Sequence, residues 1–137
     1  MTNADTDADR DSIDAANHRI WEAAHEDPEG SRDEAKRLEQ RAVEIGYLRG
    51  QAEAARTHGY ALAILDNVEE AFKKHNAALE LLSGPNVHAP DVLATVHDSI
   101  ANLYYFVGMY AQSFEHSQRG IEYAREAGSV RVEAYCL

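Results

Sequence analysis

The residues best suited to chemistry in this chain are its seven histidines, because imidazole binds transition metals and carries protons near neutral pH. Their spacing does not predict a metal site. No His-Glu-x-x-His motif occurs, since His25-Glu26 runs into Asp27-Pro28, which is typical of a turn. His88 and His97 flank an expected helix start and share no helix face with a third ligand. We therefore expect no metal site, and we expect His75 to pack between hairpins.

Motifs for nucleophilic catalysis and for phosphate binding are missing from the sequence. It contains no Gly-x-Ser-x-Gly elbow and neither of the glycine-rich phosphate loops. The 24 acidic residues are spread along the chain, and no pair of them is singled out in an apolar pocket. Cys136 is the only cysteine, so we expect a structural thiol. The sequence favours a non-catalytic protein without a cofactor; a perturbed acid or histidine in a closed cleft would favour an enzyme.

The charge of the chain bounds its partners. A formal net charge of −11 disfavours binding to nucleic acid and to anionic membrane surfaces. It leaves two interpretations, acidity that keeps the protein in solution and acidity that attracts a basic partner. The start of the chain is acidic and lacks the apolar core of a signal peptide, and no apolar run is long enough for a membrane span. We expect a cytoplasmic protein.

The elements that must position any site are helices. Apolar residues recur at three- and four-residue steps, and the three prolines lie at or between the helical stretches. We predict an all-α fold with a disordered acidic segment at 1–8, and we expect Ser31 and Asp91 to cap helices. The expected helices pair into hairpins at about 9–46, 50–83 and 90–127, followed by the start of a further helix at 129–137.

Small residues mark an internal repeat. Each expected hairpin holds three of them, separated by twelve and then seven positions, and an aliphatic residue follows each third one. Small side chains let two helix backbones approach closely, so we expect these positions to be helix crossings. A hairpin that cannot bury its own apolar face stacks on the next one. The nine positions are Ala23, Ala35, Ala42, Gly59, Ala71, Ala78, Ala101, Ser113 and Gly120.

This pattern resembles the tetratricopeptide repeat (TPR) family over residues 10–127. Tyr104, Gly108 and Tyr110 match aromatic, glycine and aromatic positions of the repeat, and Gly59 matches the glycine of its first helix. Glu39, His75 and Ser117 stand where the family has an aromatic residue. The longer, uneven period is more similar to TPR-like arrays of bacterial regulatory proteins. The resemblance implies a right-handed superhelical stack of antiparallel hairpins, about three plus the start of a fourth.

The resemblance also implies a concave groove lined by the first helix of each hairpin. Its groove-facing positions include Asn17, Ile20 and Ala24 in the first hairpin. Those that we expect to bind a protein or peptide segment are Arg56, Tyr60, Asp98, Asn102 and Tyr105. The implied function is a non-catalytic interaction or scaffold module, the regulatory part of a larger signalling protein such as a diguanylate cyclase, a kinase or a transcription regulator. The alternative is a small-molecule sensor whose ligand contacts Tyr60, Asn102 and Tyr105.

The last residues of the sequence predict one further contact. Val132-Glu133-Ala134 resembles the Ala52-Glu53-Ala54 run that leads into the middle hairpin. A repeat array that lacks a polar capping helix exposes an apolar face. We therefore expect the protein to continue beyond Leu137, or this end to pair with another copy as a homo-oligomer.

Overall fold

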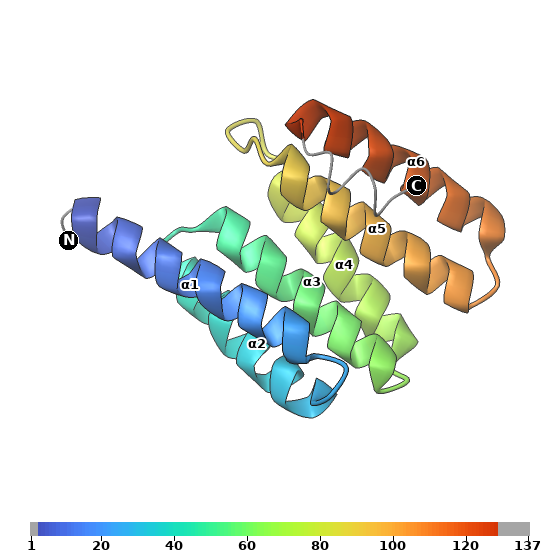
Figure 1. The fold of residues 1–137 in the computed structure, drawn as a ribbon, viewed down its shortest axis with the longest axis horizontal. Helices are drawn as coiled ribbons and strands as arrows, with labels where there is room; N and C mark the ends of the chain where they lie inside the picture. The colour runs from blue at the N-terminus through green and yellow to red at the C-terminus, as the bar shows by residue number, and fades with distance from the viewer. Residues whose placement is uncertain (1–2, 129–137) are drawn as a thin grey trace. The chain divides into compact units, whose positions relative to one another are not determined.

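The computed structural model describes residues 3–128, and all regular secondary structure in that range is α-helical, as the sequence predicts (Figure 1). The predicted helix at 129–137 lies outside the described residues. The chain divides into two compact units, one up to Leu81 and one from Leu82 onward. No described helix is long and apolar enough to cross a membrane. The six helices are α1 (Asn3–Ala23), α2 (Pro28–Glu44), α3 (Leu48–Ile64), α4 (Val68–Leu82), α5 (Pro90–Phe106) and α6 (Tyr110–Ala127).

Helix α1 begins earlier than the sequence analysis expects. It starts at Asn3, so the prediction of a disordered segment at 1–8 is wrong for residues 3–8. Acidic residues are favourable near a helix N-terminus, and the alanines among them are the strongest helix formers, so a segment that looks like a polar tail joins the helix. The helix ends at Ala23, and the amide groups of Glu26 and Asp27 in the following turn both bond to the Ala23 carbonyl.

The expected helix caps are displaced by residues just upstream. Asp27 caps α2, and its side chain accepts a hydrogen bond from the Gly30 amide at 3.0 Å. Ser31 instead lies buried inside the helix, where its hydroxyl donates to the Ile20 carbonyl of α1 at 2.9 Å. Proline suits the first position of a helix, because the N–H group that it lacks would have no partner within the helix there. Pro90 therefore opens α5, with Ala89 as the N-cap residue, and Asp91 falls within the first turn.

The same tight turn joins three pairs of helices, α2 to α3, α3 to α4 and α5 to α6. In each, a residue with positive φ follows the helix, and the next amide bonds the carbonyl five residues back, as in a Schellman motif. Two of the turns use glycine, whereas the α3–α4 turn places Asp66 at a φ of 64°. The three amide-to-carbonyl bonds are Tyr47 to Ala42, Asn67 to Leu62 and Met109 to Tyr104.

In the first unit, α3 packs against both α1 and α2. The core between them contains Ile20 of α1, Ala35 and Leu38 of α2, and Ala54 of α3. Polar contacts hold α1 against α3. The side-chain amide of Asn17 donates a hydrogen bond to the Gly50 carbonyl at 3.1 Å. The Tyr47 hydroxyl, at the start of α3, donates to the Asp14 carboxylate at 2.8 Å. Burial and this carboxylate raise the pKa of Tyr47 to about 12, so it stays a donor at neutral pH.

Helix α4 approaches α3 closely at a glycine. A Cβ atom on Gly59 would lie 2.8 Å from Cε1 of His75 and 3.0 Å from the Ala71 carbonyl oxygen, both on α4. His75 is 1% exposed, and the contact with Gly59 lies within one predicted hairpin, whereas the sequence predicts packing between hairpins. Its Nδ1 atom has no hydrogen-bond partner, and burial with the nearby Arg56 charge lowers its pKa to about 4. The sequence explains this contact, since only a small residue fits opposite the imidazole.

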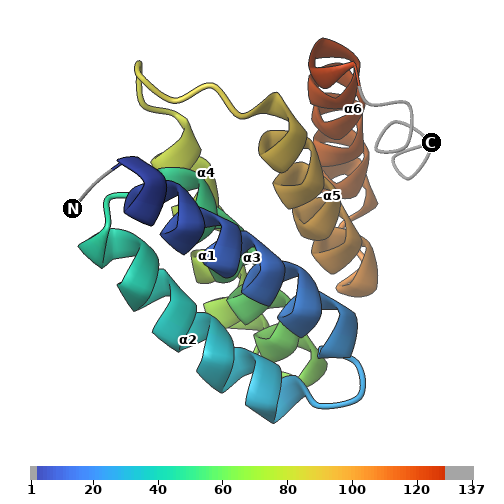
Figure 2. The same ribbon diagram turned by 60° about the vertical axis from the view of Figure 1, so that its left-hand side comes forward.

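The second unit is built on α5 and α6, which run side by side (Figures 1 and 2). Val96 and Ile100 of α5 are buried. The hydroxyl of Ser113 donates to the Ala101 carbonyl at 2.8 Å, which links two of the small positions directly. Gly128 ends α6 in the left-handed region, as the sequence predicts.

None of the nine small positions of the repeat is exposed in the structure. Seven are buried, and Ala23 and Ser113 are half-buried. Ala24, the neighbour of Ala23, is fully buried in its place. At the end of α1 the buried position therefore lies one residue beyond the predicted small position.

Candidate functional site

The candidate functional site lies on α1 and α3 and is formed by four residues, Trp21, His25, Arg56 and Tyr60, here called the Trp21 cluster. The guanidinium carbon of Arg56 lies 3.5 Å from the centre of the Trp21 ring, a close cation–π contact. The Tyr60 ring packs on Trp21 with centroids 4.5 Å apart and planes tilted by 37°. The Tyr60 hydroxyl also hydrogen-bonds Nε2 of His25, whose ring meets Tyr60 edge-on.

Local structure explains why these residues meet. Arg56 and Tyr60 are four residues apart on α3 and therefore project from one face of the helix. Trp21 lies on the last turn of α1, and His25 follows in the turn that leads to α2. Trp21, Arg56 and Tyr60 are half-buried and His25 is exposed, so the cluster is both packed and accessible from solvent.

The electrostatics of the cluster favour recognition over proton transfer. Burial raises the pKa of Tyr60, and the nearby Arg56 charge only partly offsets this effect. The phenol therefore stays protonated at neutral pH and does not serve as a base. Arginine, tyrosine and tryptophan are the side chains that most often dominate the binding energy of protein interfaces. The cluster offers a cation and two aromatic faces to a ligand, without an activated nucleophile.

The structure divides the predicted groove residues between the two units. Arg56 and Tyr60 lie together in the first unit, whereas Asp98, Asn102 and Tyr105 lie on α5 in the second. Of these three, Asn102 and Tyr105 are exposed and Asp98 is half-buried. A groove that joins all five residues remains a prediction.

Three expected groove positions on the first helix are wrong. Asn17, Ile20 and Ala24 are at most 3% exposed, because this face of α1 packs into the core. Trp21 lies one position beyond Ile20 and contacts the α3 residues instead. The residue type could have identified Trp21 from the sequence, because it is the only tryptophan of the chain and such a large ring usually packs against other residues.

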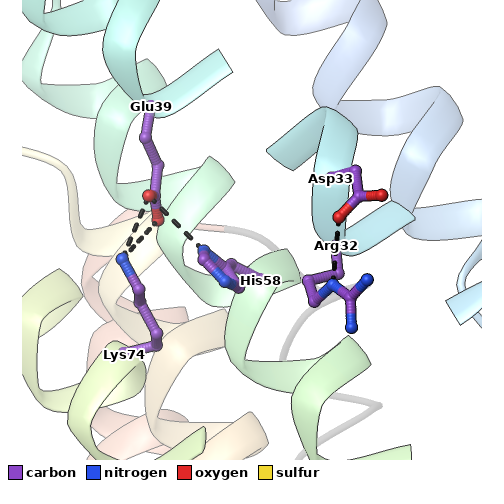
Figure 3. Close-up of polar contacts among 5 residues, drawn as sticks. All are labelled: Arg32, Asp33, Glu39, His58 and Lys74. Atoms are coloured by element: carbon purple, nitrogen blue, oxygen red, sulfur yellow. Dashed lines mark hydrogen bonds and ion pairs between the residues drawn. The ribbon is translucent and has the colours of Figure 1, made fainter. Parts of the chain in front are cut away.

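A second polar cluster joins three helices of the first unit (Figure 3). The Glu39 carboxylate on α2 accepts hydrogen bonds from Nζ of Lys74 on α4 at 3.1 and 3.4 Å. Nδ1 of His58 on α3 lies 3.5 Å from the same carboxylate. The Arg32–Asp33 pair in the figure is local to α2, with 3.0 Å between Nε and Oδ1. Glu39 thus fills a position expected to be aromatic and is satisfied there by two polar partners.

The ionisation of Glu39 explains why this cluster is structural. Burial alone raises its pKa, but the hydrogen bonds from His58 and Lys74, together with their charges, outweigh burial and hold the pKa below the ordinary value of a glutamate. The carboxylate is therefore charged at neutral pH and engaged with both partners. It ties α2 to α3 and α4.

The second unit holds a histidine pair. Nδ1 of His97 on α5 and Nδ1 of His116 on α6 are 3.0 Å apart, so one ring donates a hydrogen bond to the other. Tyr123 stacks on His97 and Tyr104 stacks on His116. Burial, then the neighbouring His116 and Arg119 charges, lowers the pKa of His97 to about 4. Within residues 3–128 no three His, Cys, Asp or Glu side chains are arranged to hold a metal ion.

Comparison with known proteins gives no independent assignment. The sequence matches no family model, no curated protein matches it, and no solved structure resembles it closely enough to count as a match. The functional argument therefore depends on the side chains described above.

Proposed function

We propose that this chain is a non-catalytic, TPR-like helical repeat module that binds a protein or peptide segment, in the way that regulatory modules of signalling proteins do. The single observation that carries the binding role is the Trp21 cluster. It places Arg56 and Tyr60, both expected at a binding face, against the only tryptophan of the chain. Such residues supply much contact energy for little loss of side-chain entropy.

Two features of the structure support the repeat architecture within this proposal. The same tight turn recurs between α2 and α3, α3 and α4, and α5 and α6, which is expected when one structural unit is used repeatedly. In the first unit, α3 packs on both helices of the preceding hairpin. That contact is how a stacked array buries the apolar face that a lone hairpin leaves exposed.

Trp21 makes the proposal testable without a known ligand. Because it is the only tryptophan, its fluorescence reports on the cluster alone. We would screen pools of random peptides of about ten residues, and a separate collection of metabolites, by thermal shift and then by Trp21 emission. A peptide at about 100 times its Kd should stabilise the fold by about 2.7 kcal/mol. We expect peptides, not metabolites, to stabilise the protein and change Trp21 emission.

Matched variants connect the signal to the site. R56Q should weaken peptide binding about tenfold or more, because it removes the charge that lies over the indole. R41Q is the control, since Arg41 is an exposed arginine of the same unit whose charged partner is Asp9. Equal affinity of the two variants would contradict a binding role for the Trp21 cluster. Stabilisation by a metabolite alone would replace the proposal with the small-molecule sensor.

A further inference from the structure

The turn between α5 and α6 exposes the largest group of apolar side chains in the described chain. This group, here called the apolar tip, comprises residues that are between 40% and 70% exposed. The rings of Tyr105 and Tyr110 touch across the turn, with centroids 5.3 Å apart, and Phe114 lies one helical turn beyond Tyr110. The members of the apolar tip are Tyr105, Phe106, Val107, Met109, Tyr110 and Phe114.

The apolar tip lies in an uncharged stretch of an otherwise highly charged chain. No Asp, Glu, Lys or Arg occurs from Ser99 to Phe114, between Asp98 and Glu115. Over the whole chain 27% of residues are charged, so a gap of this length at an exposed turn needs a reason. Exposed aromatic residues without nearby charges are costly in water, and on soluble proteins such patches usually mark an interface.

The area of the apolar tip fits a dimer interface. Taking 150–250 Å² for a whole aromatic side chain, the exposed fractions of the four aromatic members give roughly 400–650 Å², and Val107 and Met109 add to this. The largest apolar patch on a typical monomer is about 300–600 Å², whereas a stable interface buries about 800 Å² on each partner. One apolar tip facing another would therefore bury about what a standard interface requires.

We propose that the apolar tip is a self-association surface whose occupant is the apolar tip of a second copy of this chain. Two chains of charge −11 repel each other over most of their surface, and the uncharged tip is where they can meet without pairing like charges. Aromatic rings and Met109 also pack well against their own kind. This surface differs from the C-terminal end that the sequence analysis assigned to a homo-oligomer.

Sedimentation equilibrium and light scattering on the full chain test the proposal. The protein would be measured from about 1 to about 200 µM with a reductant, so that Cys136 cannot cross-link two copies. We expect a monomer–dimer equilibrium with a Kd in the micromolar range. Added salt should tighten the dimer by screening the repulsion between acidic chains, whereas a dimer held by ion pairs would weaken.

Two double variants, one in the apolar tip and one in the first unit, locate the interface. Y110S/F114S should raise the dimer Kd at least tenfold, because both rings are about 65% exposed and removing them costs the fold little. V43S/L48S removes exposed apolar side chains from the first unit and should leave the Kd unchanged. A monomeric wild type at about 200 µM, or a dimer that survives Y110S/F114S, would overturn the proposal. A monomer that bound an amphipathic leucine–lysine peptide through the tip would assign the surface to a different partner.

Discussion

His75 shows at the residue scale how a single buried ring couples folding to pH. Its pKa is lowered to about 4 in the folded chain by burial and by the Arg56 charge, against about 6.5 for an exposed histidine. As the pH falls below about 6.5, His75 of the unfolded chain binds a proton, whereas His75 of the folded chain stays neutral until the pH is near 4. The free energy of unfolding should therefore fall as the pH drops from about 6.5 to about 4, by up to about 3 kcal/mol for this residue.

Urea unfolding between about pH 7.5 and pH 4.5 measures this dependence directly. H75F removes one of two strongly shifted rings and should make the profile less steep over that range, with the buried His97 accounting for the slope that remains. H75L serves the same purpose if the larger phenyl ring clashes at Gly59. H18F, at an exposed histidine of α1, is the control and should keep the wild-type slope. A profile equally steep in H75F and wild type would contradict the assignment to His75.

At the element scale, stability depends on how closely two helices pack where they cross. A substitution at Gly59 tests this for α3 and α4. In an ordinary helix, Gly to Ala stabilises by about 1 kcal/mol through helix propensity. Here the new methyl group would meet His75 and the Ala71 carbonyl at 3.0 Å or less. Overpacking costs about 1–3 kcal/mol, so we expect G59A to lower the free energy of unfolding by about 1 kcal/mol.

A double-mutant cycle with H75A separates crowding at the crossing from other causes. Removing the imidazole leaves only the Ala71 carbonyl near the new methyl group, so G59A should cost less in the H75A background. Chemical denaturation of the four proteins gives the coupling energy. If G59A raised the stability of the wild type, the close approach of α3 and α4 would be refuted.

Much at the element scale was predictable from the sequence because glycine, proline and small residues have local meanings. Gly128 follows the last residue of α6, and α3 to α6 lie close to the predicted helical stretches, whereas α1 begins earlier than predicted. The caps were not predictable in the same way, since Ser31 and Asp27 are both good capping residues and only the contact with Ile20 decides between them.

The candidate site was half predictable for a related reason. Helical spacing places Arg56 and Tyr60 on one face of α3. Which α1 residues contact Arg56 and Tyr60 depends on the rotation of α1 about its own axis. The resemblance to the TPR family predicted this rotation incorrectly, because it placed the buried Asn17 and Ile20 on the side of the groove. A shift of one residue turns a helix by about 100°, and this is enough to exchange Ile20 for Trp21 at the surface.

At the scale of the whole molecule, excess negative charge should limit stability. With 24 acidic and 13 basic residues, the folded chain repels itself more than an expanded one does. Raising the salt concentration from about 10 to about 150 mM shortens the screening length from about 30 to about 8 Å. We expect the Tm at pH 7 to rise by a few degrees over this range.

Circular dichroism melting at low protein concentration measures the salt effect on the monomer, and Y110S/F114S checks that self-association does not contribute. A Tm that fell with salt would mean that attractive pairs such as Glu39 with Lys74 outweigh the general repulsion. That result would contradict the charge argument while leaving the Trp21 cluster untouched.

The connection between α4 and α5 is longer than the tight turns elsewhere. We therefore expect the chain to tolerate inserted residues there. The connection runs from Ser83 to Ala89 and contains a backbone bond from the Val87 amide to the Gly84 carbonyl. Added residues at this point disturb few contacts and lengthen a closed loop at little entropic cost. An epitope tag or a fluorophore-bearing insert should be accepted between Pro85 and Asn86, whereas the same insert at Gly46 or Gly108 would break a turn that permits no extra residue.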